Sequence, residues 1–177
     1  NKGRVYSLKA YEIPEAGRQA KGTAIVNLLN INPEEKITAV IPVDEFSEDL
    51  NMVMLTKKGT IKKTELEQFN SIRKSGMIAI TLKEEDALIN VKLTKENDEI
   101  IIVTKNGIAI RFSQKDVRVM GRNAAGVRAI ELKEDDEVVS MDIAEDSKYL
   151  LVITEKGYGK RTELNEYKTQ KRGGKGI

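Results

Sequence analysis

The stretch Ile101-Ile102-Val103-Thr104-Lys105-Asn106-Gly107 sets the architecture of this chain, because similar stretches recur along it. An apolar run ending in Thr-x-x-Gly also occurs at 53–59 and 151–157, and Gly3 holds the same position in a shortened first copy. The successive glycines lie 56, 48 and 50 residues apart. Self-similarity at such a period is typical of repeat proteins, in which neighbouring units share a core.

Two further landmarks follow each of these first glycines. A second glycine comes 17 or 19 residues later, and an apolar residue comes 10 residues later. We expect the apolar residues to anchor loops in the core. The second glycines are Gly22, Gly76, Gly126 and Gly176, and the apolar residues are Ile13, Phe69, Val117 and Tyr167.

Short segments with a period of two predict strands, as at 89–93 and 139–143. The turn Lys105-Asn106-Gly107 predicts a tight hairpin, and we expect the polar turns 94–98 and 144–148 to join strands into hairpins as well. This gives about four strands per repeat, including one after each second glycine. The sequence predicts an all-β, propeller-like array of four-stranded blades.

We expect residues 1–177 to form a single repeat domain of about three to four blades. Their approximate limits are 1–56, 57–104, 105–154 and a partial 155–177.

Composition excludes several classes of protein. The chain has no Cys and no His, which removes disulfides, thiolate zinc sites and His-based triads. No apolar run approaches the roughly 18 residues of a membrane span. Adjacent acids such as Asp135-Asp136-Glu137 point apart, and Gly173-Gly174-Lys175-Gly176 lacks the frame of a P-loop. We therefore expect no catalytic, metal or cofactor site in this chain.

Charge alternates along the repeats although the net charge is only +2. Residues 105–130 carry six Lys and Arg against one Asp, whereas residues 131–154 carry two Lys against eight Asp and Glu. The other repeats show the same alternation. Because equivalent parts of stacked blades face the same way, the basic parts predict a positive stripe that a polyanion could follow through phosphate contacts.

The most basic loop is Gln170-Lys171-Arg172-Gly173-Gly174-Lys175-Gly176. It resembles the box motif Gln-Arg-Arg-Gly-Gly-Lys-Gly of the C-terminal domain of DNA gyrase A, with Lys171 in place of an arginine. Gly3-Arg4-Val5-Tyr6 and Gly157-Tyr158-Gly159-Lys160-Arg161 resemble the same family. In that family the box lies in the first blade, so 170–176 is either the principal box or a later, box-like loop.

This resemblance implies a β-pinwheel, usually of six blades, whose basic edge wraps duplex DNA before strand passage. It implies a non-catalytic part of an ATP-dependent type II topoisomerase, since the cleavage tyrosine lies in a region without a counterpart here. ATP and Mg²⁺ would act elsewhere in an A2B2 holoenzyme with the remainder of gyrase A and with gyrase B. We expect a monomeric fragment, no membrane association and a bacterial, cytoplasmic, nucleoid-associated location.

Two rival hypotheses remain. The first is the C-terminal domain of the corresponding polypeptide of topoisomerase IV, which shares the blades but has degenerate or missing boxes. The second is a propeller scaffold whose basic rim binds acidic proteins. The predicted DNA-contacting residues are Gln170, Lys171, Arg172, Gly173, Gly174, Lys175, Gly176, Arg18, Lys21, Arg73, Lys74, Arg118, Arg122, Arg128, Lys160 and Arg161.

Overall fold

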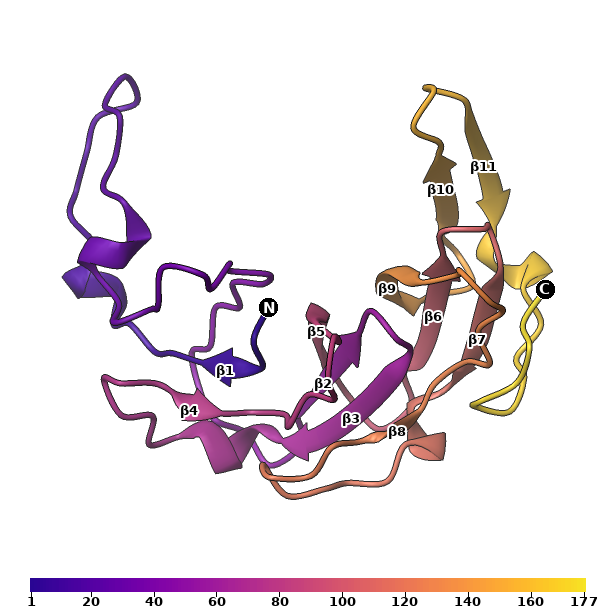
Figure 1. The fold of residues 1–177 in the computed structure, drawn as a ribbon, viewed down its shortest axis with the longest axis horizontal. Helices are drawn as coiled ribbons and strands as arrows, with labels where there is room; N and C mark the ends of the chain where they lie inside the picture. Colours follow the sequence, from indigo (N-terminus) through magenta and orange to yellow (C-terminus); the bar gives the residue numbers. More distant parts are fainter.

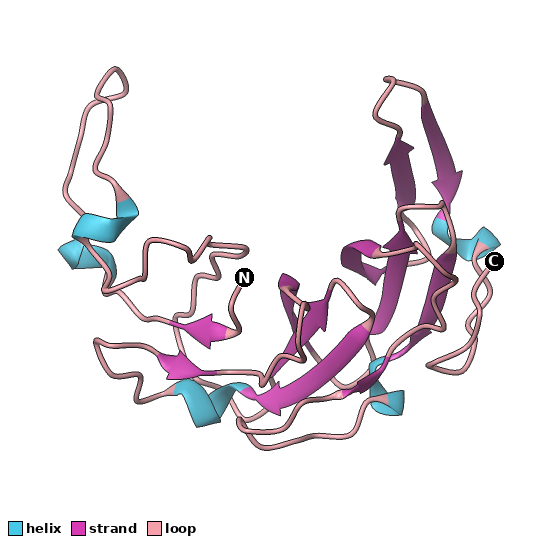
Figure 2. Cartoon of the chain, viewed as in Figure 1, coloured by secondary structure: helices cyan, strands magenta, loops and turns pink.

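The computed structural model describes all residues from 1 to 177 and has the shape of an open arc (Figure 1). Antiparallel strands and short 3-10 turns make up its regular structure (Figure 2). No helix of the structure has the length and apolar character needed to cross a bilayer, since the longest is the four-residue turn η3. The all-β prediction is confirmed.

From β2 to β9 the elements follow one another twice in the order strand, strand, 3-10 turn, strand, strand. Their bounds are β1 Arg4–Val5, η1 Ala10–Glu12, η2 Ile25–Asn27, β2 Asn51–Thr56, β3 Thr60–Glu65, η3 Leu66–Phe69, β4 Met77–Ile78, β5 Leu88–Thr94, β6 Glu99–Thr104, β7 Ala109–Ser113, η4 Gln114–Asp116, β8 Val127–Arg128, β9 Val138–Ala144, β10 Tyr149–Ile153, β11 Gly159–Glu163 and η5 Leu164–Glu166.

Four sheets follow one another along the arc. Their strand orders are β1-β4, β5-β2-β3-β8, β7-β6-β9 and β10-β11. The turns at the first glycines close the hairpins β2-β3, β6-β7 and β10-β11, which confirms the hairpin predicted at 105–107. In Figure 1, β5 and β9 lie towards the concave side of the arc, whereas β8 lies at the convex side.

The strand after each second glycine pairs with the preceding repeat rather than with its own. In β8, Val127 and Arg128 pair with Ile61 and Thr60 of β3. Met77 and Ile78 of β4 pair in the same way with β1. At the end of the chain, Ile177 exchanges two hydrogen bonds of 2.8 Å with Ala109 at the start of β7. Each repeat thus completes the outer edge of the one before it.

The predicted hairpins at 94–98 and 144–148 are wrong. Strand β5 pairs with β2 and strand β6 with β7 and β9, so the turn between β5 and β6 crosses from one sheet to the next. The turn between β9 and β10 does the same. The alternating pattern identifies a strand but not its partner. We call a hairpin together with the later strand that pairs with its first strand a hairpin unit. The two complete hairpin units run over 51–94 and 99–144. The predicted repeat limits at 57 and 105 therefore fall inside the hairpins β2-β3 and β6-β7.

The core lies between neighbouring sheets, as expected for stacked repeats. Both faces of β2 are buried: Met52 and Met54 pack into one cluster with Phe69, whereas Val53 and Leu55 pack into another with residues of the following sheet. This burial on both faces explains the uninterrupted apolar runs that precede the first glycines.

The apolar anchors behave differently in the four copies. Phe69 and Val117 are buried in the two clusters, as predicted, and Tyr167 is half-buried against Leu164. The prediction for Ile13 is wrong, because this side chain is 55% exposed. It lies in the segment 6–50, which forms only the short turns η1 and η2 and has no sheet to receive the anchor.

The fold generates a prediction about two glycines with positive φ. A Cβ atom at Gly126, where φ is +94°, would lie 2.6 Å from the Ile61 carbonyl oxygen, whereas a Cβ at Gly107, where φ is +80°, would meet nothing within 4 Å. We expect Gly107→Ala to lose about 1 to 2 kcal/mol of unfolding free energy from backbone strain alone. Gly126→Ala should lose about 1 to 3 kcal/mol more, because β8 must move. We call β4 and β8, which pair with the preceding repeat, the exchanged strands. Denaturant unfolding of both variants measures this difference, and equal losses would contradict the close approach.

Candidate nucleic-acid interface

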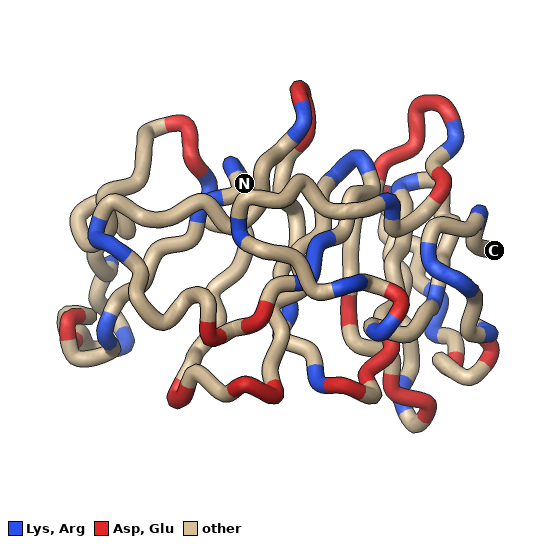
Figure 3. The backbone as a smooth tube through the Cα atoms, turned by 90° about the horizontal axis from the view of Figure 1, so that it is seen from below, with Lys and Arg blue, Asp and Glu red and all other residues tan.

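The loops that precede the second glycines lie side by side on the convex surface of the arc. We call the segments 70–76, 120–126 and 170–176 the box loops. Each follows a 3-10 turn and leads into the strand that pairs with the preceding repeat. Figure 3 views this convex surface and shows Lys and Arg segments across its middle, with Asp and Glu mainly on turns along both margins and a few between them. Part of the alternation of charge along the sequence therefore becomes a separation between the middle and the margins of this surface.

The predicted DNA-contacting residues fall into two groups by exposure. Ten are exposed and six are partly buried. The exposed ones are Arg18, Lys21, Arg73, Lys74, Arg118, Arg128, Lys160, Arg161, Lys171 and Lys175, and the partly buried ones are Gln170, Arg172, Gly173, Gly174, Gly176 and Arg122.

Six of the exposed cations lie in or next to the box loops. They have no carboxylate within ion-pairing distance in the structure, so their charges are directed to solvent. These six, which we call the box cations, are Arg73, Lys74, Arg118, Arg128, Lys171 and Lys175.

The structure does not bring the other four exposed cations to the same place. Arg18 and Lys21 lie in the segment 6–50, which extends from one end of the arc (Figure 1). Lys160 and Arg161 belong to strand β11, and the Arg161 guanidinium lies 4.5 Å from the centre of the Tyr149 ring.

The last box loop is attached to the preceding repeat by backbone hydrogen bonds. The Gln170 N–H donates to the Arg111 carbonyl at 2.7 Å, and the Gly173 N–H donates to the Ala129 carbonyl at 2.8 Å. A Cβ at Gly176, where φ is +70°, would lie 2.5 Å from the Ala109 carbonyl oxygen. Gly173, Gly174 and Gly176 are among the predicted DNA-contacting residues, but strand pairing is sufficient to explain Gly176.

Three cations of the basic segments face the interior instead of solvent, which sequence reasoning missed. Lys62 is fully buried, and its ammonium donates to the carbonyls of Ala79, at 2.6 Å, and of Arg122. The Lys63 ammonium donates to the Gln114 side-chain oxygen at 2.8 Å. A sequence signal for the burial of Lys62 was available: when the repeats are aligned, Lys62 occupies the same position as the apolar Ile110.

Arg111 is the corresponding link to the last repeat and is only 6% exposed. Its guanidinium pairs with Glu99 and Asp146 and donates to the Leu164 carbonyl at 2.8 Å. Since Glu99 lies in the same sheet and Asp146 and Leu164 flank the hairpin β10-β11, this side chain ties two neighbouring repeats together. Arg111, like Lys62 and Lys63, contributes to packing and not to the surface charge.

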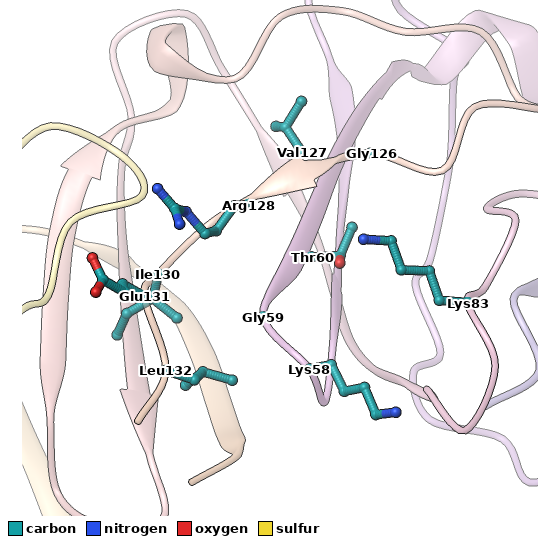
Figure 4. Close-up of a pocket in the computed structure, with 10 residues that line it drawn as sticks. All are labelled: Lys58, Gly59, Thr60, Lys83, Gly126, Val127, Arg128, Ile130, Glu131 and Leu132. Carbon is teal, nitrogen blue, oxygen red and sulfur yellow. The ribbon is translucent and has the colours of Figure 1, made fainter. Parts of the chain in front are cut away.

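A small cleft lies at the seam where β8 joins β3. Its volume is about 280 Å³, and its ten lining residues are labelled in Figure 4. Lys83 extends across it towards Thr60, while Arg128 points from β8 towards the last box loop. Lys58 points away, and its ammonium donates to the Glu84 carbonyl. Lys83 is exposed and is a further cation at this cleft, although it is not among the predicted DNA-contacting residues.

Comparison with known proteins shows which family the chain belongs to. The family described as "DNA gyrase C-terminal domain, beta-propeller" matches residues 1–44, 51–95, 98–145 and 148–177. The chain belongs to this family. The second and third matched segments contain the hairpin units 51–94 and 99–144 of the structure.

Relatives of the gyrase C-terminal domain family resemble the chain over its whole length. DNA gyrase A of Clostridium acetobutylicum is 65% identical over all 177 residues, which span 21% of that protein. A crystal structure of the C-terminal domain of DNA topoisomerase IV has a TM-score of 0.92 at 32% identity, and a DNA gyrase A C-terminal domain has 0.85 at 30%. The whole of the present chain is matched in both comparisons. It covers 55% of the topoisomerase IV chain and 57% of the gyrase A chain.

The buried Lys62 generates a prediction about pH. Burial, with a smaller contribution from the charge of Arg122, lowers the pKa of Lys62 to about 8, whereas an unfolded lysine keeps a pKa of about 10.4. Between these values the unfolded state binds more protons, so stability should rise with pH. Denaturant unfolding from pH 7.5 to 10 should show the unsubstituted protein gaining stability relative to Lys62→Met. The difference in stability between the unsubstituted protein and the exposed control Lys105→Met should not change with pH. If the difference between the unsubstituted protein and Lys62→Met is also independent of pH, the assignment is refuted.

Proposed function

We propose that this chain binds duplex DNA along its convex surface and bends it, as the non-catalytic DNA-wrapping part of a gyrase. The observation that carries the proposal is the recurrence of exposed, unpaired box cations in three successive repeats. Equivalent loops on one curved surface would meet one continuous polyanion.

The variation among the box cations supports phosphate contact rather than base reading. The three loops place their cations differently: Arg73 and Lys74 are adjacent, whereas Lys171 and Lys175 are four positions apart. Phosphate contacts tolerate such differences, because they fix position without reading sequence. Smooth bending of a short duplex costs on the order of 1 to 6 kcal/mol. Release of counterions from several phosphates can offset this cost.

The wider assembly is also part of the proposal, since the chain spans about a fifth of the length of the gyrase A relative. We infer that the partners are double-stranded DNA, the remainder of gyrase A, and gyrase B in an A2B2 holoenzyme. In that assembly this part presents a DNA segment for strand passage and supercoiling. ATP and Mg²⁺ would act elsewhere in it. We place it in the bacterial cytoplasm at the nucleoid and expect the isolated chain to be monomeric.

Topoisomerase IV supplies the second candidate assembly. Its C-terminal domain gives the higher TM-score of the two structures compared, 0.92 against 0.85. The gyrase assignment is supported by the nearly complete box at 170–176 and by the 65% identity to the gyrase A relative. In either assembly we expect the convex surface to bind the DNA.

The proposal predicts steeply salt-dependent binding. The logarithm of the association constant for duplex DNA should fall linearly with the logarithm of salt concentration, with a slope of about −0.9 per neutralised phosphate. Lys171→Ala with Lys175→Ala should make this slope shallower by about 2, as measured by fluorescence anisotropy. Lys148→Ala is the matched control, because Lys148 pairs with Glu145, and should leave the slope unchanged.

Length dependence separates DNA wrapping from the acidic-protein scaffold. A DNA-wrapping surface should bind long duplexes more tightly than short ones and release a labelled duplex to unlabelled duplex competitor. Binding that is insensitive to salt and to duplex length would reject the proposal and leave the scaffold hypothesis.

A further inference from the structure

One position of the box loop faces inward in successive repeats. Four residues before the second glycine, the four copies have Arg18, Ile72, Arg122 and Arg172. Arg18 lies in the segment 6–50 and is exposed, so the inward orientation applies to the three box loops. Ile72 packs against the cluster that contains Phe69, and both Arg122 and Arg172 are partly buried. A position that accepts a packed isoleucine is not one whose side chain must reach a phosphate.

The contacts of Arg172 are made entirely within the chain. Its Nε donates to the Asp116 carbonyl at 2.8 Å, and its Nη1 donates to the Arg128 carbonyl. Its backbone N–H also donates to the Asp116 carboxylate at 3.3 Å. Two donors of one planar guanidinium therefore hold the 3-10 turn η4 and the exchanged strand β8. A lysine ammonium lacks the rigid fork that fixes the directions of these two donors.

Arg122 also reaches the preceding repeat, one repeat earlier, through a single side-chain contact. Its Nη1 contacts the Met77 sulfur in the exchanged strand β4, and its carbonyl accepts a hydrogen bond from the buried Lys62. Met77 in β4 is equivalent to Val127 in β8, the residue next to the Arg128 that Arg172 contacts. In two consecutive repeats, the inward arginine of a box loop thus contacts the exchanged strand of the repeat before it.

Lys171 and Lys175 differ from Arg172 in their exposure and in their lack of side-chain hydrogen bonds with the rest of the chain. They flank it in the same loop, are exposed, and pair with no carboxylate in the structure. The loop thus has one cation committed to the protein and two directed to solvent.

We propose, building on the DNA-binding function above, that Arg122 and Arg172 are positioning residues and not phosphate ligands. Each clasps its box loop to the exchanged strand of the preceding repeat and so fixes the offset between neighbouring box loops. That offset sets the course of DNA across the convex surface. Lys171 and Lys175 contact the phosphates.

The test uses the full-length polypeptide that contains this chain, assembled with its partner polypeptide, and two measurements. The slope of duplex affinity against salt counts phosphate contacts. The change in linking number, after a nicked circular plasmid is ligated in the presence of the protein, reports the path of the bound DNA. The variants are Arg172→Lys, Arg122→Lys, Arg172→Gln and the pair Lys171→Ala with Lys175→Ala.

We expect Arg172→Lys and Arg172→Gln to leave the salt slope unchanged and to reduce the linking-number change per bound protein by about twofold or more. The lysine pair should make the slope shallower by about 2. Each variant must be folded at the assay temperature, as shown by a cooperative unfolding transition above it. A lower unfolding midpoint is expected for the arginine variants, because they lose contacts between repeats. If Arg172→Lys does not fold, Arg172→Gln, which also breaks the contacts with Asp116 and Arg128, decides the question.

Two outcomes would overturn the inference. Retention of the full linking-number change by Arg172→Lys would show that charge alone matters at this position. A slope shallower by about 1 in Arg172→Gln would show that Arg172 contacts a phosphate. Failure of the proposed function looks different, because then the unsubstituted protein itself would bind DNA without salt dependence.

Discussion

Pairing between the outer strand of one repeat and the strand after the second glycine of the next is the interaction on which the structure depends. Without it the outer edges of β3 and β7 would present unpaired backbone groups to solvent. Gly126 and Gly176 make the pairing possible, because a Cβ at either position would collide with a carbonyl of the preceding repeat. The pairing also draws each box loop onto the convex surface and beside its neighbour.

This exchange explains why cations with similar sequence surroundings have opposite roles. A box loop lies against the preceding repeat, so carbonyls from two repeats converge beneath it. Lys62, Arg111 and Arg172 direct their donors to such carbonyls. Lys171 and Lys175 lie on the outer side of the same layer and face solvent. Burial next to hydrogen-bond acceptors therefore separates the cations that hold the repeats together from those available to a polyanion.

The repeat landmarks explain how much could be predicted. Glycines with positive φ leave a clear signal in sequence, because few other residues adopt that conformation, and the turn at Gly107 and the second glycine at Gly126 are where the spacing places them. The buried anchors Phe69 and Val117 follow from the same spacing. Ile13 occupies the same position and is exposed, because an anchor requires a neighbouring sheet that its own sequence does not encode.

The repeat, its strands, the alternation of charge and the basic character of the loop at 170–176 can all be predicted from the amino-acid sequence. These depend on local properties: the period of apolar residues, the backbone freedom of glycine and the sign of each side chain. The three-dimensional fold was needed to show that β5 pairs with β2 and not with β6, and that Lys62 and Arg111 are buried while Lys171 and Lys175 are exposed. Strand partners and burial depend on contacts between segments far apart in the sequence, both within one repeat, as for β5 and β2, and between repeats, as for Lys62, so a local pattern does not specify them.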